Sequence, residues 1–370
     1  MSENTSNTGG IAGQVGAQLQ EAQASVEAFV SEAMARGQKG MELANAAPQP
    51  VGLTPKEELY SRGTLRLYHY EPMVDEVYRI PVLLVMATTN KAFVFDLAPG
   101  RSMIEYMLKQ GFDVYVLDWE PPTMAERGLT LSDYTQDFIP TCIEKIQRDS
   151  GEEDINIIGY CMGGVLSLIY AATHADGPLK NLVCLTTPVD FHRMGIAQVW
   201  NDPKYFDVDT LVDTVGVLSK EAVTQMFEMQ RPAQKLAGQL RYWENILNDD
   251  FVDSYRAMVR WGDETLPLAG EYLRETTKEL QWGNKLYTGE LKVAGKSANL
   301  KNVEVPLLSV VAEHDHLAPR GATQELLELV SSEDKEEILL KGGHVSLIAG
   351  PNAAKRMWPR LNEWLSVRSV

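Results

Sequence analysis

The chain has 370 residues, with 34 Lys or Arg against 51 Asp or Glu, so its formal charge is −17. A surface this acidic repels phosphate backbones, which argues against a nucleic-acid partner. Hydrophobic residues make up 44% and charged residues 23%, which excludes a chain that is disordered throughout.

The cysteines and the N-terminus bear on location. Cys142, Cys161 and Cys184 are too few and too scattered for a disulfide framework or a cysteine-rich zinc site, so we expect no metal and a reducing, cytoplasmic environment. The first ten residues lack the basic start and apolar core of a signal peptide. Because no apolar run approaches roughly 18 residues, we also expect no transmembrane segment.

Residues 1–50 are rich in Ala, Gln, Ser and Gly, and they contain a regular apolar stripe. The stripe follows alternating spacings of four and three residues: Val15, Leu19, Ala22, Val26, Phe29 and Ala33. This pattern predicts a helix with a narrow coiled-coil-like face, which either packs on its own chain or meets a partner subunit, a dimer mate or an apolar surface. Residues 46–50 predict a linker, and we assign residues 1–64 to an N-terminal helical extension and linker.

From residue 65 short apolar strands alternate with helices, which predicts an α/β fold with a mostly parallel sheet flanked by helices. The expected strands are 65–70, 77–80, 82–86, 113–118, 155–158, 182–185, 307–311 and 337–340, the first two forming an antiparallel start. The expected helices are 102–110, 134–148 and 165–172. Residues 191–302 break this rhythm with helices and loops, so we predict a helical cap inserted into a core of residues 65–190 and 303–370.

The sharpest motif is Gly159-Tyr160-Cys161-Met162-Gly163-Gly164, between an expected strand and an expected helix. That context fits a nucleophile elbow of the form G-x-S-x-G, with Cys in place of Ser. The sharp turn strains the nucleophile and requires residues without a Cβ two before and two after it. The helix N-terminus supports a thiolate, and the backbone N–H of Met162 is the expected oxyanion donor. We expect Cys142 and Cys184 to be core residues.

A nucleophile elbow is followed along the chain by an acid and then a histidine. His344 follows the late strand 337–340 in a glycine-flanked loop, so it is the expected base. Asp315 and Asp190 each end a strand and are the candidate acids, and the usual position after the penultimate strand favours Asp315. His314 and His316 stand on either side of Asp315, but no carboxylate or Cys cluster completes a metal site around them.

A second oxyanion donor is expected in the loop after strand 82–86, where Thr89 is our candidate. Asp118 and Trp119 end another strand on the same edge of the sheet. They either shape the pocket or simply pack there.

The sequence resembles the polyhydroxyalkanoate synthases, α/β-hydrolase enzymes, and within them the class III or class IV type whose catalytic subunit works with a second subunit. The resemblance covers roughly residues 50–370, with a looser match in 191–302. It rests on segments in family order: Thr54-Pro55-Lys56, Leu67–Tyr70, Asn90-Lys91, Phe95-Asp96-Leu97, Asp118-Trp119, Gly159–Gly164, Thr187–Phe191, Asp315-His316 and Gly343-His344.

The resemblance implies polymerisation of (R)-3-hydroxyacyl-CoA, with release of CoA, through a Cys thioester. Cys161 would be the nucleophile, His344 the base and Asp315 the acid, which either orients the base or helps activate the incoming 3-hydroxyl. Asn90, Asp118, Trp119 and His316 would contact substrate.

The same resemblance implies no cofactor, since the CoA thioester is itself the substrate. The implied partners are the growing polyester and a second, non-catalytic subunit, with a homodimer or hetero-oligomer as the assembly. The implied location is the cytoplasm at the surface of polyester granules, with 3-hydroxybutyryl-CoA as the expected substrate.

Two other functions fit parts of the sequence. A dienelactone-hydrolase-like enzyme also uses a Cys elbow, but such enzymes lack a long helical cap. A non-catalytic granule-associated protein would have no need of Cys161, Asp315 and His344 together.

Overall fold

The computed structural model describes residues 8–350 and 352–370, and it divides into two compact units. The smaller unit comprises residues up to Gln49 together with Ala233–Arg256, and the larger comprises Pro50–Pro232 and Ala257–Val370. The larger unit contains every residue that we singled out for catalysis.

The larger unit is organised around an eight-stranded sheet in the order β1-β2-β4-β3-β5-β6-β11-β12, counted over the described residues. β1 pairs antiparallel with β2, and β2 with β4, whereas all other neighbours are parallel. The sheet strands are β1 (Lys56–Arg62), β2 (Leu65–Tyr70), β3 (Val82–Val85), β4 (Val114–Trp119), β5 (Ile155–Tyr160), β6 (Leu179–Leu185), β11 (Leu307–Ala312) and β12 (Lys335–Leu340).

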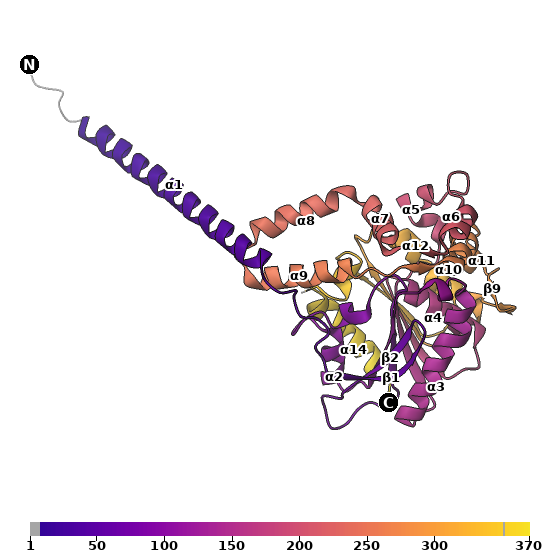
Figure 1. Ribbon diagram of the computed structural model, residues 1–370. Coiled ribbons are helices and arrows are strands. Elements are labelled where there is room, and N and C mark those ends of the chain that lie inside the picture. Colours follow the sequence, from indigo (N-terminus) through magenta and orange to yellow (C-terminus); the bar gives the residue numbers. More distant parts are fainter. Residues whose placement is uncertain (1–7, 351) are drawn as a thin grey trace, which may run out of the picture. The chain divides into compact units, whose positions relative to one another are not determined.

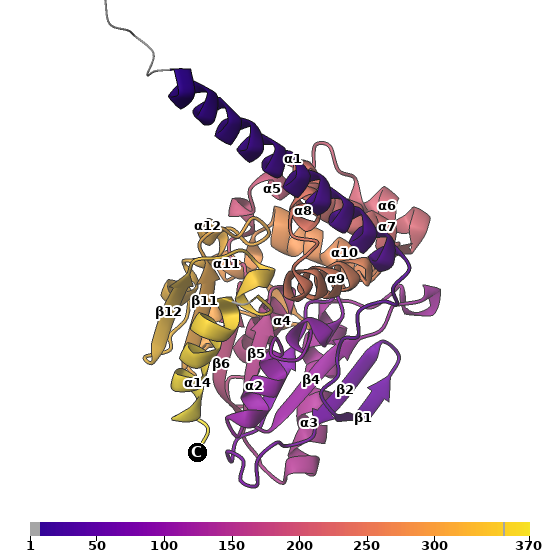
Figure 2. The ribbon, with the colours of Figure 1, turned by 90° about the vertical axis from the view of Figure 1, so that its left-hand side faces the viewer.

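Helices cover both faces of this sheet (Figure 1). α2 (Met103–Lys109) and α14 (Trp358–Ser366) pack together on one face, and α3 (Ile139–Ser150) and α4 (Met162–Thr173) lie on the other (Figure 2). Because β3, β4 and β5 are covered on both faces, all their residues are buried, which explains their continuous apolar runs. The predicted mostly parallel sheet with flanking helices is confirmed.

The predicted antiparallel start is wrong in one strand. Residues 77–80 form no strand, because Tyr78 instead donates its backbone N–H to Gly111 and packs its ring on Phe112 at 4.9 Å. The antiparallel partner of β2 is β1, so the sheet begins at Lys56, within the segment that we had assigned to the extension and linker. β1 is a mostly exposed edge strand, and edge strands lack the apolar pattern of buried ones.

The segment predicted as a cap is mainly helical, with two short strand pairs, β7 (Val217–Leu218) with β8 (Leu268–Ala269) and β9 (Lys292–Val293) with β10 (Lys296–Ser297). Its helices are α5 (Ile196–Trp200), α6 (Val208–Val215), α7 (Lys220–Gln230), α8 (Pro232–Glu244), α9 (Asp249–Asp263), α10 (Gly270–Glu275) and α11 (Lys285–Thr288). Two short helices follow β11, namely α12 (Arg320–Thr323) and α13 (Leu326–Leu329). The segment is not one compact body, since Ala233–Arg256 belongs to the smaller unit.

The smaller unit contains the predicted N-terminal helix, α1 (Thr8–Ala44). Lys39 forms an ion pair with Asp249 at 2.9 Å, and the Arg256 guanidinium donates to the carbonyl of Ala47 at 2.7 Å. Leu19, Val26 and Phe29 of the apolar stripe are exposed, while the side chain of Val15 lies outside the described residues. The role of the stripe stays a prediction. None of the described helices has the length and hydropathy needed to cross a membrane.

Candidate active site

Cys161 lies at the carboxyl end of β5, directly before α4, with φ 54° and ψ −120°. This left-handed backbone is strained for a residue with a side chain, and it persists because the surrounding structure holds it there. A Cβ on Gly159 would lie 2.5 Å from the Cα of Gly164, and one on Gly163 would lie 2.1 Å from the carbonyl oxygen of Val85. The predicted elbow geometry, with its two required glycines, is therefore present.

His344 and Asp315 form a buried pair beside the elbow. Nδ1 of His344 and Oδ2 of Asp315 are 2.6 Å apart, and the Asp315 side chain is fully buried. The other carboxylate oxygen, Oδ1, accepts from the backbone N–H groups of Leu317 at 2.8 Å and Ala318 at 2.9 Å. Since a carboxylate only accepts, Nδ1 carries a proton, and Nε2 is the nitrogen left for Cys161.

The electrostatics of His344 identify Cys161 as its neighbour. Burial alone would lower the pKa of His344, but the charge of Cys161 and hydrogen bonds to Asp315 and Cys161 outweigh it and raise the pKa to about 10. A base that binds a proton this firmly next to Cys161 can accept the proton that the sulfur must lose before it attacks as a nucleophile.

The alternative acid and the other cysteines are engaged elsewhere. Asp190 accepts from the side-chain amide of Asn284 at 2.8 Å and forms an ion pair with Arg193 at 3.1 Å. Cys142 and Cys184 are fully buried, as predicted for core residues, and burial raises the pKa of both thiols. The structure thus brings Asp315, rather than Asp190, to His344.

The two candidate oxyanion donors come from the elbow itself and from the loop after the neighbouring strand β3. Met162 is the first residue of α4, where backbone N–H groups have no partner within the helix. Thr89 lies in the loop after β3, and the tight approach of Gly163 to Val85 places the end of that strand against the elbow. The Met162 amide is held by the start of α4, whereas the Thr89 amide can point at a developing oxyanion only if its loop is held in place.

The four predicted substrate-contact residues have different surroundings. Asp118 accepts from the backbone N–H of Ala92 at 2.8 Å, and the indole of Trp119 donates to the carbonyl of Met86 at 2.9 Å. Asn90 is nearly buried and bridges to the cap at Thr265. His316 is next to Asp315. Its pKa is lowered, first by burial and then by the nearby positive charge of Arg231. Their contact with substrate stays a prediction.

Two aromatic residues near the triad were not singled out from the sequence. The ring of Tyr160 lies 5.0 Å from that of His344, and its hydroxyl is buried with no hydrogen-bond partner among the described residues. Tyr272 of α10 is buried, and its hydroxyl accepts from that of Thr88 at 3.3 Å. Tyr160 occupies the variable position of the elbow motif, and Tyr272 comes from the cap, so neither had a sequence signal.

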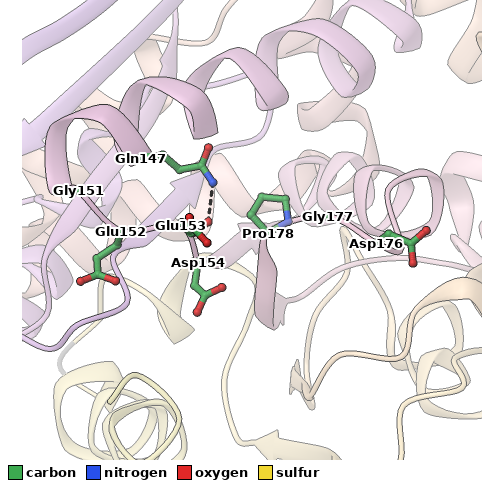
Figure 3. A pocket seen from close by; sticks show the side chains of 8 residues that line it. All are labelled: Gln147, Gly151, Glu152, Glu153, Asp154, Asp176, Gly177 and Pro178. Atoms are coloured by element: carbon green, nitrogen blue, oxygen red, sulfur yellow. Dashed lines mark hydrogen bonds between the residues drawn. The ribbon is translucent and has the colours of Figure 1, made fainter.

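A surface pocket lies at the amino ends of β5 and β6, at the other end of these strands from Cys161 (Figure 3). It is lined by Gln147, Gly151–Asp154 and Asp176–Pro178, which precede β5 and β6, whereas Cys161 follows β5. Arg79 forms ion pairs with Glu152 and Asp154 of this lining. Within residues 8–350 and 352–370, no group of three or more His, Cys, Asp or Glu is arranged to hold a metal ion.

Comparison with known families gives two matches. Residues 81–351 match the family described as alpha/beta hydrolase fold, and residues 39–107 match the one described as Poly-beta-hydroxybutyrate polymerase (PhaC) N-terminus. Among solved structures, a carboxylesterase of Nitrososphaera gargenis is similar with 15% identity and a TM-score of 0.50, covering 85% of this chain and 98% of that one. This likeness supports the fold alone.

Two curated relatives are similar over most of the chain. One from Thiocystis violacea is 34% identical and covers 90% of this chain and 94% of its own, and one from Haloferax mediterranei is 34% identical and covers 86% and 65%. Both are named "Poly(3-hydroxyalkanoate) polymerase subunit PhaC". The chain therefore spans slightly under two thirds of the haloarchaeal relative and nearly all of the bacterial one.

Proposed function

The chain belongs to the poly(3-hydroxyalkanoate) polymerase family and has its α/β-hydrolase fold, and on this basis we propose that it polymerises a (R)-3-hydroxyacyl-CoA with release of CoA. The observation that carries the proposal is the strained Cys161 beside the buried His344–Asp315 pair. These three residues supply a nucleophile, a base and an orienting charge. The proposed reaction accordingly needs no cofactor, and the CoA thioester is its substrate.

In the first half-reaction, the Cys161 thiolate attacks the thioester carbonyl carbon. The carbonyl oxygen becomes an oxyanion between the backbone N–H groups of Met162 and Thr89. When the tetrahedral intermediate collapses, the bond to the CoA sulfur breaks, and the imidazolium of His344 gives that sulfur its proton. One thioester replaces another, so the acyl group keeps its reactivity.

In the second half-reaction, His344 acts as the base toward an alcohol. Its neutral Nε2 takes the proton of a 3-hydroxyl, and the oxygen attacks the acyl-Cys161 carbonyl carbon to form an ester and free the thiolate. We assign Asp315 to orienting His344 rather than to activating the hydroxyl. Both of its carboxylate oxygens already accept hydrogen bonds, and its side chain is fully buried.

The finer points of this proposal follow the relatives. Because both are named as a polymerase subunit, we infer that this chain also works with a second, non-catalytic subunit, as a homodimer or hetero-oligomer. We propose 3-hydroxybutyryl-CoA as the substrate, and the cytoplasmic surface of polyester granules as the location.

The test is to incubate the purified chain with (R)-3-hydroxybutyryl-CoA, alone and with a candidate partner subunit, and to follow free CoA and insoluble polyester. We expect both products, and we expect Cys161→Ala to form no acyl-enzyme while Cys142→Ala and Cys184→Ala still do. CoA release that yields only free hydroxy acid would indicate a hydrolase instead.

A further inference from the structure

The loop that carries the second oxyanion donor is fixed from two sides. This loop, residues 87–91, joins β3 to the short helix Ala92–Phe95, and we call it the β3 loop. It carries Thr89, and it starts where the elbow approaches the end of β3 most closely. A hydrogen-bond donor that stabilises an oxyanion must be held in place before the charge develops.

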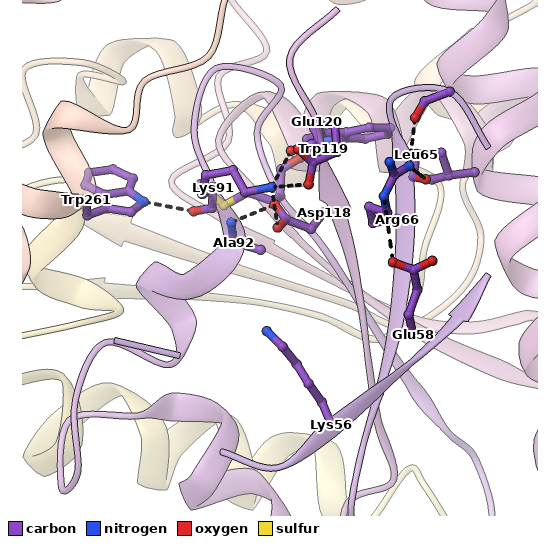
Figure 4. A network of polar contacts seen from close by, with 12 residues as sticks. Lys56, Glu58, Leu65, Arg66, Lys91, Ala92, Asp118, Trp119, Glu120 and Trp261 are labelled. Atoms are coloured by element: carbon purple, nitrogen blue, oxygen red, sulfur yellow. Dashed lines mark hydrogen bonds and ion pairs between the residues drawn. The ribbon is translucent and has the colours of Figure 1, made fainter. Parts of the chain in front are cut away.

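Lys91 fixes the loop to the end of β4 (Figure 4). Its ammonium group lies 2.7 Å from the carbonyl oxygen of Trp119, 2.9 Å from Oδ2 of Asp118 and 3.0 Å from Oε1 of Glu120. Asp118 also accepts the backbone N–H of Ala92 at 2.8 Å through Oδ1, so one carboxylate bonds both the side chain and the following backbone. All three ammonium hydrogens thus have an acceptor within reach, which is the full capacity of a Lys head group.

This Lys is not an exposed ion pair. Burial lowers the pKa of Lys91, but the opposite charge and hydrogen bond of Asp118, with those of Glu120, outweigh it and raise the pKa. The residue therefore keeps its charge. A charge held in a half-buried place with three acceptors fixes the backbone that carries it more firmly than a surface pair would.

The cap fixes the same loop from the other side. The Trp261 indole donates to the carbonyl oxygen of Lys91 at 2.9 Å (Figure 4), and the backbone N–H of Leu266 donates to that of Thr89 at 2.7 Å. The remaining contacts are the bridge between Asn90 and Thr265 and the hydrogen bond between the hydroxyls of Thr88 and Tyr272. Four consecutive loop residues, 88–91, are thus each bonded to the cap segment 261–272, which lies far away in sequence.

We propose that Lys91 and Trp261 are positioning residues that hold the β3 loop so that the Thr89 N–H meets the oxyanion, which makes the cap segment 261–272 part of the catalytic apparatus. The inference rests on the proposed function, because that function assigns the oxyanion to Thr89. Neither residue touches the reacting atoms. Each acts through the loop backbone, Lys91 through its ammonium group and Trp261 through its indole N–H.

The test uses Lys91→Met and Trp261→Phe, with Lys109→Met as the control. Lys109 pairs with Glu105 within α2, and no hydrogen bond or ion pair among the described residues joins it to the β3 loop. We expect Lys91→Met to lower kcat for CoA release by about 10²-fold, and Trp261→Phe by about 10-fold, with KM changed by less than about 3-fold. The double variant should lose less than the product of the two single losses, because both act on one loop.

Alkylation of Cys161 by iodoacetamide distinguishes positioning from damage to the fold. This displacement creates no oxyanion, so its rate should be the same in wild type, Lys91→Met and Trp261→Phe. An unchanged kcat in Lys91→Met would overturn the proposal. A parallel fall of kcat and alkylation rate would also overturn it, since that result means that the elbow itself is disturbed.

An aldehyde probe separates this inference from the proposed function. The Cys161 thiol adds to the carbonyl carbon of butyraldehyde and its proton passes to the oxygen, so the hemithioacetal oxygen occupies the oxyanion site without any polymerisation. Butyraldehyde should protect Cys161 from iodoacetamide. The butyraldehyde concentration that gives half-maximal protection should be about 10-fold higher for Lys91→Met than for wild type. If wild type makes no polyester but this difference appears, the proposed function fails and the positioning role stands. Equal protection in both proteins refutes the positioning role.

Discussion

Replacing Gly163 with Ala should damage the elbow and nearly abolish turnover. The added Cβ would lie 2.1 Å from the carbonyl oxygen of Val85 and 2.8 Å from the carbonyl carbon and oxygen of Met86. All are backbone atoms, so no side chain can rotate away. To reach even 3.0 Å, α4 and β3 must separate by about 0.9 Å, in a region packed like a crystal.

That separation determines the expected magnitude. Overpacking in a core typically costs about 1–3 kcal/mol, and two backbone segments that cannot yield place Gly163→Ala near the upper value. The same shift displaces Cys161 relative to its base and oxyanion donors, and a misplacement of about 1 Å can lower the rate by about 10²-fold. We therefore expect both a loss of about 3 kcal/mol in unfolding free energy and a fall of at least about 10²-fold in CoA release.

Urea denaturation measures the first quantity, and CoA release from (R)-3-hydroxybutyryl-CoA measures the second. Gly128→Ala is the matched control, because that glycine is exposed and a Cβ there meets no atom within 4 Å. A Gly163→Ala protein with the stability and turnover of Gly128→Ala would refute the reasoning, since it would show that the elbow tolerates a side chain there.

Three further predictions concern single residues. Asp315→Asn should lower CoA release by at least about 10²-fold, because an amide cannot hold His344 in the required tautomer, whereas Asp190→Asn should lower it by less than about 5-fold; similar losses would contradict the assignment of the acid. Burial lowers the pKa of His69, but Asp113 and Asp149 outweigh it and raise the pKa, so its stabilisation is complete below about pH 6.5 and disappears as the pH rises through the raised pKa. The difference in unfolding free energy between wild type and His69→Gln should therefore narrow as the pH is raised above about 6.5. A difference that widens over this range would be evidence against a protonated His69 ring. Ser102→Ala should lower the unfolding free energy by about 1 kcal/mol in urea titrations, because the Ser102 hydroxyl caps α2 by accepting from the N–H of Glu105 at 2.9 Å; no loss would mean that water replaces the cap.

The elbow could be read from the sequence because its requirements are local. A strand, two glycines at fixed offsets and a helix within one short segment leave few other conformations for Cys161. Asp315 and His344 are far from Cys161 in sequence, yet parallel strands bring their carboxyl ends to one edge, so chain order alone could predict that they meet. The geometry of the three residues agrees with that reading.

What the sequence could not provide were contacts between segments that share no pattern. β1 is an edge strand of largely polar residues, so its sequence lacks the apolar alternation that would have predicted a strand. Asp118 was correctly placed at the end of a strand, but its partner Lys91 comes from a loop whose course depends on the whole sheet. The hydrogen bond between Trp261 and the Lys91 carbonyl is beyond local prediction for the same reason, since an indole N–H gives no sign in the sequence of the carbonyl that it will meet.

The proposed chemistry explains why so much bonding surrounds one loop. In the proposed chemistry, an oxyanion forms at the same point in both half-reactions, once as CoA leaves and once as an alcohol attacks. A misplaced Thr89 N–H would therefore slow both. In the proposed reaction, water competes with the 3-hydroxyl for the acyl-Cys161 intermediate, and excluding it would require the cap to close over the site. Because the cap segment that bonds the β3 loop contains Trp261 and Tyr272, a cap that has moved away should also leave the oxyanion poorly held. The acyl-enzyme would then be least reactive when water could reach it, which favours transfer to the polyester over hydrolysis without any group that distinguishes an alcohol from water.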